Sequence, residues 1–251
     1  MITRKNPDEL AKMRRAGRVV AETIAAVAAA VRPGITTGEL DTIAEHEIRS
    51  RGAVPSFLGY RGFPATICTS INHEIVHGIP GRKVLSEGDL FKLDCGAIVE
   101  GFHADSAVTI PVGEVAPELS KLIETTERAL WAGIEEVRVG NRLGDIGHAV
   151  QTVAEGAGFS VVREYVGHGV GRALHEEPPV PNYGDPSRGI RLEPGLVIAI
   201  EPMVNVGGKE TVLLEDGWTV VTEDGSHSAH FEHTVAVTPE GPEVLTAPAA
   251  H

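Results

Sequence analysis

The sequence predicts a mixed α/β fold of the α+β kind, built from two similar helix–helix–sheet units. In each half of the 251 residues, two helical stretches precede segments typical of β-strands. The segment VRPGITTGEL at 31–40 matches VRVGNRLGDI at 137–146, an offset of 106 residues. The same offset, to within one residue, relates three pairs: Gly52 and Gly158, Gly88 and Gly195, Asp94 and Glu201. A self-match at a nearly constant offset indicates an internal duplication, so we expect one domain over 1–251 with half-repeats at about 7–112 and 117–240.

Helices open the first half. Asn6 followed by Pro7 and Glu9 is typical of a helix start, because it combines a capping side chain, a proline in the first turn and a capping acid. This helix should run to about Val31 and end at the Arg-Pro-Gly turn at 32–34. A second helix and three strand-like segments should follow, at 37–51, 65–70, 88–99 and 101–110.

The second half repeats this order of elements. Pro117 opens it, and we expect helices near 117–137 and 142–156. Strands should follow at 160–166, 196–204, 217–224 and 230–238.

Composition and charge exclude several classes of function. A formal net charge of −13 argues against nucleic acid as a main partner, because phosphate binding needs a clustered basic surface. The two cysteines, Cys68 and Cys95, are too few for a disulfide framework. The N-terminus lacks the apolar core of a signal peptide, and the most hydrophobic helical run, at 23–31, is too short to span a bilayer. We therefore expect a cytoplasmic protein with no DNA and no membrane partner.

Two acids lie in a predicted β-hairpin. If a two-residue turn is centred on Glu100-Gly101, paired residues have numbers that sum to 201. Asp94 then faces Ala107, and Asp105 is its diagonal neighbour on the same face. A three-residue loop would break this parity. Taken alone, either acid is better explained as a turn cap or as the partner of a lysine such as Lys92.

Glu201 and Glu232 occupy the corresponding places in the second half. Glu201 ends the apolar run LVIAI, and Glu232 shares a strand face with His230 and Thr234. Four carboxylates that converge in a core need cations, because like charges would otherwise drive protonation or unfolding. Two divalent ions would balance them, and a neutral histidine would complete a shell without adding charge. Such an oxygen-rich set suits manganese, iron(II) or cobalt, and a pair of these ions polarises carbonyls and activates water, which predicts a hydrolase.

Two histidines raise a separate question. His168 and His175 lie seven residues apart, with Gly167, Gly169 and Gly171 around the first. The glycines argue against a helix, and on a straight strand an odd interval sends the two side chains to opposite faces. A glycine-rich connector with incidental histidines therefore stays open as an explanation.

Five sequence blocks in a fixed order are highly specific for one family. They are INHEIVHGIP (71–80), KLDCGAIVEGFHADSA (92–107), GHGVGRALHEEP (167–178), AIEPMVN (199–205) and AHFEHTVAVT (229–238). Through them the chain resembles, over essentially its whole length, the type I methionine aminopeptidases of peptidase family M24. The resemblance implies the pita-bread fold, a pseudo-two-fold arrangement that agrees with the internal repeat. We expect no N-terminal zinc-binding extension, and the short interval between His175 and Glu201 leaves no room for the helical insert of the type II enzymes.

The resemblance implies a dinuclear metal centre. Its ligands would be Asp94, Asp105, His168, Glu201 and Glu232. Asp105 and Glu232 would bridge two divalent ions. Asp94 would complete one site, and His168 with Glu201 would complete the other. The expected ions are cobalt, manganese, iron(II) or similar.

The resemblance also implies catalytic and substrate-binding residues. Glu201 would act as general base, and His175 would hydrogen-bond the substrate amide and its tetrahedral oxyanion. His77 would orient or protonate the leaving group, although without the motif it is better explained as a loop histidine before a turn. The pocket for the methionine side chain would be lined by Tyr60, Phe63, Cys68, Leu174 and Trp218, an apolar wall that suits a thioether.

Two pocket positions depart from the family pattern. Tyrosine is frequent in place of Phe63, and an aromatic residue in place of Leu174, so the shape of the pocket should differ while its chemistry stays the same. For Phe63 and Cys68 an ordinary place in the core also stays open. His230, where an amide is common, is expected to support Glu232 with a contact from behind.

The implied activity is removal of the initiator methionine from new polypeptides, favoured when the second residue is small. The expected partners are N-terminal Met peptides, nascent chains and, transiently, the ribosome, with the enzyme itself a monomer. A prolidase or Xaa-Pro aminopeptidase would share the five ligands but normally needs a further N-terminal domain, which 251 residues cannot hold. A non-catalytic homologue that binds proteins typically loses ligands, and a phosphoesterase would need basic residues beside the acids.

Overall fold

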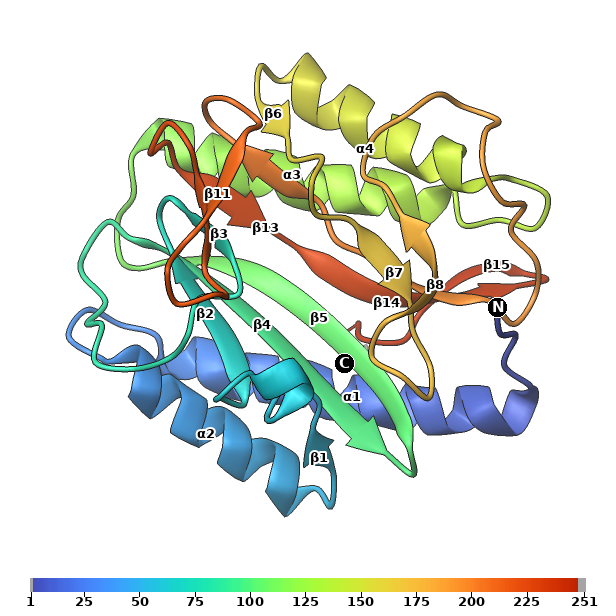
Figure 1. Cartoon of the computed structure of the whole chain (residues 1–251), viewed down its shortest axis with the longest axis horizontal. Coiled ribbons are helices and arrows are strands. Elements are labelled where there is room, and N and C mark those ends of the chain that lie inside the picture. The colour runs from blue at the N-terminus through green and yellow to red at the C-terminus, as the bar shows by residue number, and fades with distance from the viewer. Residues whose placement is uncertain (1, 248–251) are drawn as a thin grey trace.

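Four α-helices and fifteen strands are described within residues 2–247 of the computed structural model (Figure 1). The helices are α1 (Pro7–Ala30), α2 (Thr37–Ser50), α3 (Pro117–Glu135) and α4 (Leu143–Gly156), with a 3-10 turn, η1 (Tyr60–Gly62). The strands of the first half are β1 (Val54–Pro55), β2 (Ile67–Ile71), β3 (Glu74–Val76), β4 (Leu90–Val99) and β5 (Phe102–Pro111). Those of the second half are β6 (Ser160–Val161), β7 (Gly167–Gly169), β8 (Glu176–Val180), β9 (Val197–Ile200), β10 (Met203–Asn205), β11 (Thr211–Leu213), β12 (Val220–Thr222), β13 (Ser228–His230), β14 (Glu232–Thr238) and β15 (Gly241–Val244).

One nine-stranded sheet forms the centre of the described part of the chain. Its order is β1-β4-β5-β14-β9-β7-β8, with β2 paired to β4 and β15 paired to β14. Two small three-stranded sheets, β13-β10-β6 and β11-β12-β3, lie off this path. The two halves of the chain therefore meet within the large sheet, where β5 pairs with β14.

Each helix pair packs on its own part of the large sheet. In Figure 1, α1 and α2 lie below the β4–β5 hairpin, and α3 and α4 lie above the strands of the second half. The first core joins residues of both helices to β4: Val20, Val27, Leu40, Phe91 and Leu93. The second core joins α3 and α4 to β9 and β14: Leu130, Ile134, Ile146, Ile198 and Val235. Among the described helices, none combines the length and the apolar character needed to cross a membrane.

The first helix pair forms as its sequence predicts. The Asn6 side chain accepts the Glu9 N–H at 3.0 Å, and the Glu9 carboxylate accepts the Asn6 N–H at 3.1 Å, which completes a capping box at the start of α1. α2 begins with the same device, made by Thr36 and Glu39. Gly52 follows α2 with φ of 72°, in the left-handed region that favours glycine. Both helices end within one residue of the predicted ends.

Matching local structure recurs in the second half. An isolated backbone bridge precedes the second helix of each pair, and these bridges are Thr36 with Val84, and Arg142 with Arg191. The members of the two bridges are 106 and 107 positions apart, which is the offset of the sequence repeat. The internal repeat is thus present as equal backbone pairing at equivalent positions.

The β4–β5 hairpin has the predicted register. Asp94 pairs with Ala107, and Asp105 lies opposite Gly96, as a two-residue turn at Glu100-Gly101 requires. Alternate residues of β4 are buried against the helices: Phe91, Leu93, Cys95 and Ala97. Because strand residues alternate between faces, Asp94 and Asp105 lie on the other face of the sheet.

The acid-bearing strands of the second half are shorter than predicted. The strand expected over 196–204 is two strands, because Pro202 has no N–H to donate and interrupts the ladder after Glu201. The strand expected over 230–238 breaks at Phe231, whose N–H donates to the Pro202 carbonyl at 3.3 Å. Glu232 consequently begins β14 and does not share one continuous strand with His230.

Further differences concern short strands, and four of these were not predicted: β1, β3, β11 and β15. The strand expected over 160–166 covers only β6, and the strand expected over 217–224 covers only β12. β7 and β8 were also not predicted, because the glycines and prolines of 167–180 conceal the alternation typical of a strand.

Candidate metal centre and substrate pocket

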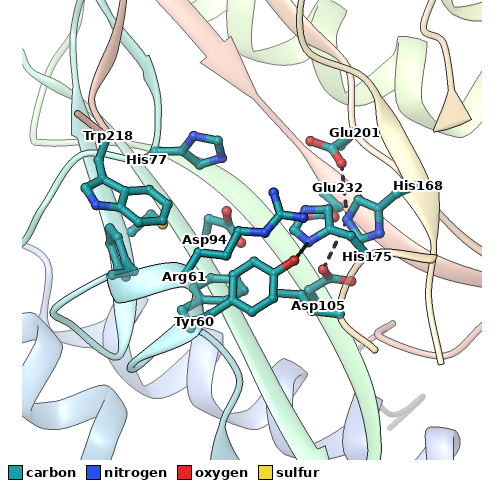
Figure 2. Close-up of a pocket in the computed structure, with 14 residues that line it drawn as sticks. Tyr60, Arg61, His77, Asp94, Asp105, His168, His175, Glu201, Trp218 and Glu232 are labelled. Carbon is teal, nitrogen blue, oxygen red and sulfur yellow. Dashed lines mark hydrogen bonds and ion pairs between the residues drawn. The ribbon is translucent and has the colours of Figure 1, made fainter. Parts of the chain in front are cut away.

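One cavity of about 150 Å³ contains every residue that the sequence predicted for the site (Figure 2). Its lining residues are Phe57, Tyr60, Arg61, Phe63, Cys68, His77, Asp94, Asp105, His168, Leu174, His175, Glu201, Trp218 and Glu232. Phe57 and Arg61 were missed by sequence reasoning. Both belong to the segment FLGYRGF at 57–63, whose paired glycines and aromatic residues signal an ordered turn beside Tyr60.

Strand register brings three of the four acids into one row. Asp94 on β4 pairs with Ala107 on β5, and Ala107 pairs with Glu232 on β14. Ala107 is small, so it leaves space between the two carboxylates. On β14 the next residue, His233, pairs with Ile200 of β9, which places Glu201 beside the start of β14.

A second row lies next to the first. The Thr234 hydroxyl donates to Asp105 Oδ1 at 3.0 Å, while Thr234 pairs with Ala199 on β9. Ala199 in turn pairs with His168 on β7. The strand order therefore sets the order of the predicted ligands across the sheet: Asp94, Asp105, Glu232, Glu201 and His168.

The carboxylates are buried without a cationic side chain to balance them. Within residues 2–247, none of the four acids forms an ion pair with lysine or arginine, and the buried Asp94 Oδ1 has no hydrogen-bond partner. Burial and neighbouring carboxylates raise the pKa of Asp94, Glu201 and Glu232 well above the ordinary values. Burial raises the pKa of Asp105 to about 6, against the opposing effects of His175 and Thr234.

Lys92 does not neutralise Asp94. Its Nζ donates to the carbonyl oxygens of Asn72 at 2.7 Å and Ser228 at 3.0 Å. The alternative in which a lysine pairs with one of the acids is therefore wrong for this lysine. Lys92 instead joins backbone of the two halves behind the site.

His168 presents one ring nitrogen to the acids. Its Nδ1 lies 2.9 Å from the Gly169 carbonyl oxygen, which can only accept, so Nδ1 carries the proton. Nε2 of the neutral ring is then a lone-pair donor, and it lies 3.5 Å from both Asp105 Oδ2 and Glu201 Oε1. Burial lowers the pKa of His168 to about 4, which keeps the ring neutral near pH 7.

His175 reaches the same centre from the turn between β7 and β8. Its ring centroid lies 4.1 Å from that of His168, and its Nδ1 lies 2.9 Å from the Tyr60 hydroxyl. The Tyr60 ring stacks on it at 5.4 Å. Burial lowers the pKa of His175 to about 4, so the group is a neutral imidazole. The interval of seven residues is thus explained: one histidine lies on a strand and the other on the following turn.

His77 lies across the cavity from these rings. It has φ of 62°, in the left-handed region that is uncommon for a residue with a side chain. Its ring meets Tyr165 and Trp218 edge-on at 6.0 and 6.4 Å. Burial lowers the pKa of His77 to about 4. The alternative of an exposed loop histidine is therefore wrong.

The remaining wall of the cavity is apolar. We call it the apolar wall, and it is made of Phe57, Tyr60, Phe63, Cys68, Leu174 and Trp218. Trp218 meets Phe63 edge-on at 5.0 Å, and Cys68 is a buried free thiol. Cys68 pairs with Asp94 in the β2–β4 register, so the apolar wall begins one strand away from the acids.

His230 lies near a different acid from the one expected. Its buried Nε2 lies 3.9 Å from Glu201 Oε2, and it has no hydrogen-bond partner among residues 2–247. The expected contact with Glu232 is wrong, because the chain bends at Phe231 between β13 and β14.

The donor set fits divalent metal ions. One potential ligand atom from each of Asp105, His168 and Glu232 lies within 4.8 Å of the others. The unpartnered Asp94 oxygen and the Glu201 carboxylate extend this group on both sides. Carboxylate oxygens with a single imidazole are the ligands that first-row divalent ions accept, and their positive charge would offset the buried negative charges.

Comparison with known proteins agrees with this geometry. The sequence model of "Metallopeptidase family M24" matches residues 11–239. Methionine aminopeptidase 1 of Bacillus subtilis (strain 168) is 54% identical over 246 residues, which are 98% of this chain and 99% of that protein. The crystal structure of methionine aminopeptidase from Rickettsia prowazekii has a TM-score of 0.97 at 44% identity, and the match covers 98% of this chain and 100% of that chain.

A more distant likeness concerns the fold alone. The prolidase from Pyrococcus furiosus has a TM-score of 0.79 at 22% identity, over 98% of this chain and 66% of that chain. The predicted pita-bread fold is confirmed by these structural neighbours. Sequence identity separates these relatives: it is 54% and 44% for the two methionine aminopeptidases but 22% for the prolidase. The chain belongs to metallopeptidase family M24 and, within it, to the methionine aminopeptidases.

Proposed function

We propose that this chain removes the N-terminal methionine from peptides and nascent polypeptides by metal-dependent hydrolysis of the first peptide bond. One observation carries the proposal: the acids and histidines share a single cavity with the apolar wall. A thioether side chain packs well against aromatic edges and a thiol. A methionine held by the apolar wall would have its own peptide bond beside the carboxylates and His175.

The proposed metal centre holds two divalent ions. The ions would be held by Asp105 and Glu232 in the middle of the group, with Asp94 at one end and Glu201 and His168 at the other. The strand order supports this division, because Asp105 and Glu232 lie between Asp94 on one side and Glu201 and His168 on the other. When bound, such ions polarise a carbonyl and lower the pKa of water. Manganese, iron(II) and cobalt suit this donor set.

The side chains around the centre would transfer the protons and hydrogen-bond the reacting groups. Glu201 would accept the proton of the attacking water as a general base and deliver it to the departing amine. His175, held by the Tyr60 hydroxyl, would donate a hydrogen bond to the amide oxygen as negative charge develops there. His77 would hydrogen-bond the amide of the second residue and help the amine to leave. Both histidines act as neutral hydrogen-bonding groups near pH 7, because the pKa of each is lowered to about 4.

The same geometry supports a preference for a small second residue. In the proposed arrangement the apolar wall holds the methionine side chain, and the scissile amide faces the histidines on the other side of the cavity. The second side chain then lies beside His77 and His175, where a bulky group would displace the hydrogen bonds to the scissile amide.

The proposed setting is the cytoplasm, with a monomeric enzyme in transient contact with the ribosome. The chemistry of the substrate supports this setting, because an initiator methionine first becomes accessible as a chain leaves the ribosome.

Peptide hydrolysis tests the proposal. Met-Ala-Ser and Gly-Pro peptides are incubated with enzyme as purified, after chelation, and after each of manganese, iron(II) and cobalt is restored. We expect Met-Ala-Ser to be cleaved, the cleavage to stop on chelation and to return with metal. Preferential cleavage of Gly-Pro would show a prolidase, and no metal-dependent cleavage of either peptide would show a binding protein. Metal analysis of the restored enzyme gives the number of ions per chain.

A further inference from the structure

Arg61 is the one cationic side chain among the residues that line the described cavity. It is exposed, and among residues 2–247 it has no carboxylate partner within ion-pair distance, although the chain carries a net charge of −13. Figure 2 shows the side chain extending past Tyr60 toward His175. An arginine without an internal partner, at the open side of a substrate cavity, is available to a ligand.

The turn around Arg61 places this side chain. Arg61 has φ of 48°, a left-handed conformation that is unusual for a residue with a side chain. Backbone hydrogen bonds close the turn: Gly59 N–H to Phe63 O at 2.8 Å, and Phe63 N–H to Tyr60 O at 2.9 Å. The guanidinium carbon lies 5.3 Å from the centroid of the Tyr60 ring, within the range of a cation–π contact. Surrounding structure therefore imposes a strained backbone that directs a cation to the mouth of the pocket.

The position of Arg61 relative to Tyr60 and His175 indicates which part of a peptide it could contact. Tyr60, on which Arg61 lies, shares a hydrogen bond of 2.9 Å with His175 Nδ1. If the methionine side chain occupies the apolar wall, as the proposed function requires, the rest of the peptide would leave through the open side of the cavity. Arg61 is thus beside the path of the residues that follow the scissile bond.

We propose that Arg61 forms a subsite for a carboxylate of the substrate downstream of the scissile bond. The inference rests on the proposed peptidase function and adds a charge preference to it. The guanidinium would pair with an acidic side chain at the third or fourth residue, or with the terminal carboxylate of a short peptide. Lysine at the same place would be repelled.

Four peptides test the subsite: amidated Met-Ala-Asp-Gly, Met-Ala-Asn-Gly and Met-Ala-Lys-Gly, and Met-Ala-Asn-Gly with a free carboxylate. In the wild-type chain, kcat/KM for the Asp peptide should exceed that for the Asn peptide by about two- to fivefold at low salt, the range of a partly exposed ion pair. The ratio should fall toward one in 0.5 M NaCl, because exposed pairs are screened. A larger ratio for the free-carboxylate peptide than for the Asp peptide would identify the chain terminus as the preferred group.

Variants decide whether Arg61 causes the preference. Arg61→Gln should bring the Asp-to-Asn ratio to about one, and Arg61→Glu should favour the Lys peptide. Arg18→Gln, on the exposed face of α1 and outside the cavity, makes the same change in net charge and should keep the wild-type ratio. If wild type shows no charge preference, or if Arg61→Gln keeps it, the subsite is wrong while the peptidase function stands. If no Met peptide is cleaved at all, the proposed function itself is wrong.

Discussion

The two halves of this chain supply the same number of acids in different ways. In the first half, Asp94 and Asp105 lie within two uninterrupted strands of ten residues each, β4 and β5. In the second half, Glu201 follows the end of β9 and Glu232 begins β14, each next to a break in its strand. The backbone bridges before the second helix of each pair are equivalent, so the halves share this pairing away from the site.

The acids of the first half are held by a continuous hairpin, whereas those of the second half are positioned by breaks in their strands. A continuous hairpin fixes two carboxylates by register alone, and its other face is buried against α1 and α2. The breaks at Pro202 and Phe231 let the second half direct Glu201 toward His168 and His230, at 3.5 and 3.9 Å. The second half also carries His168 on β7 and His175 on the turn that follows. The duplicated unit thus keeps its acids in both copies, whereas His168, the imidazole that faces Asp105 and Glu201, comes from the second copy only.

The largest effect is expected when an acid of the hairpin is replaced. Asp105→Asn should lower kcat/KM on the order of 1000-fold or more, beyond the roughly 10- to 100-fold typical of outer-shell partners, because it would remove a proposed metal ligand. The metal content should fall in parallel. The metal-free variant should melt at a higher temperature than the metal-free wild type, because one buried charge is gone. Activity assays, metal analysis and thermal unfolding of metal-free protein measure these three changes.

Asp41 provides the matched control in the same half. It accepts the backbone N–H groups of Thr66 and Ile67 at 2.9 Å each and does not line the cavity. Asp41→Asn should therefore keep the metal content and most of the activity. If Asp105→Asn retains wild-type metal and activity, Asp105 is a structural acid like Asp41.

The sequence predicts the first half of the site better than the second, because only the first half carries its acids on uninterrupted strands. The register of Asp94 and Asp105 followed from one turn, because strand parity transmits the position of a turn along a hairpin. No such rule reaches across the breaks at Pro202 and Phe231, where the chain leaves one sheet for another. The strands β7 and β8 were hidden by their glycines and prolines, and Arg61 was missed because nothing in a single arginine marks which cavity it faces.

The histidines of the second half should separate into two kinds. His168→Ala should lower the metal content, because its Nε2 faces Asp105 and Glu201. His175→Ala should keep the metal and lower kcat about 100- to 1000-fold, the usual cost of losing a donor to a developing oxyanion. Metal analysis and steady-state kinetics of both variants make the comparison. Equal loss of metal in both would contradict the separate roles.

Metal affinity should rise with pH. The pKa of Asp105 is raised to about 6, and those of Asp94, Glu201 and Glu232 are raised well above their ordinary values, so a metal must displace protons to bind. Affinity should therefore increase as pH rises through about 6, by roughly tenfold per pH unit for each proton released. His168 does not oppose this trend above pH 5, since its pKa is about 4.

The stability of the metal-free protein should change with pH in the opposite direction to the metal affinity. A raised carboxyl pKa contributes stability that is present below the unfolded value and is lost as pH rises through the folded value. The increase in melting temperature on adding metal should thus grow from pH 5.5 to pH 7.5. Calorimetric titration of metal into chelated protein at these values measures the affinity, and an affinity independent of pH would mean that the acids are already ionised.

The smallest expected effect concerns the support of the His175 turn by the N-terminal segment. Lys5 Nζ donates to Glu176 Oε2 and to Thr3 Oγ1, each at 2.8 Å, and the Lys5 side chain is only 4% exposed. Glu176 follows His175 directly and also accepts the Ala173 N–H at 3.2 Å. The pair therefore closes the turn whose last residue must reach the substrate.

Lys5→Met should lower kcat about tenfold, the lower end for a residue that orients an active group, and leave the metal content unchanged. Lys5→Arg keeps a charged donor at the same place and should recover most of kcat. Lys12→Met, which removes the ion pair between the partly exposed Lys12 and the exposed Glu100 on the far turn of the hairpin, is the control for loss of one positive charge. A wild-type kcat for Lys5→Met would mean that the hydrogen bonds within the turn suffice to hold His175. The second half would then be as self-supporting as the hairpin.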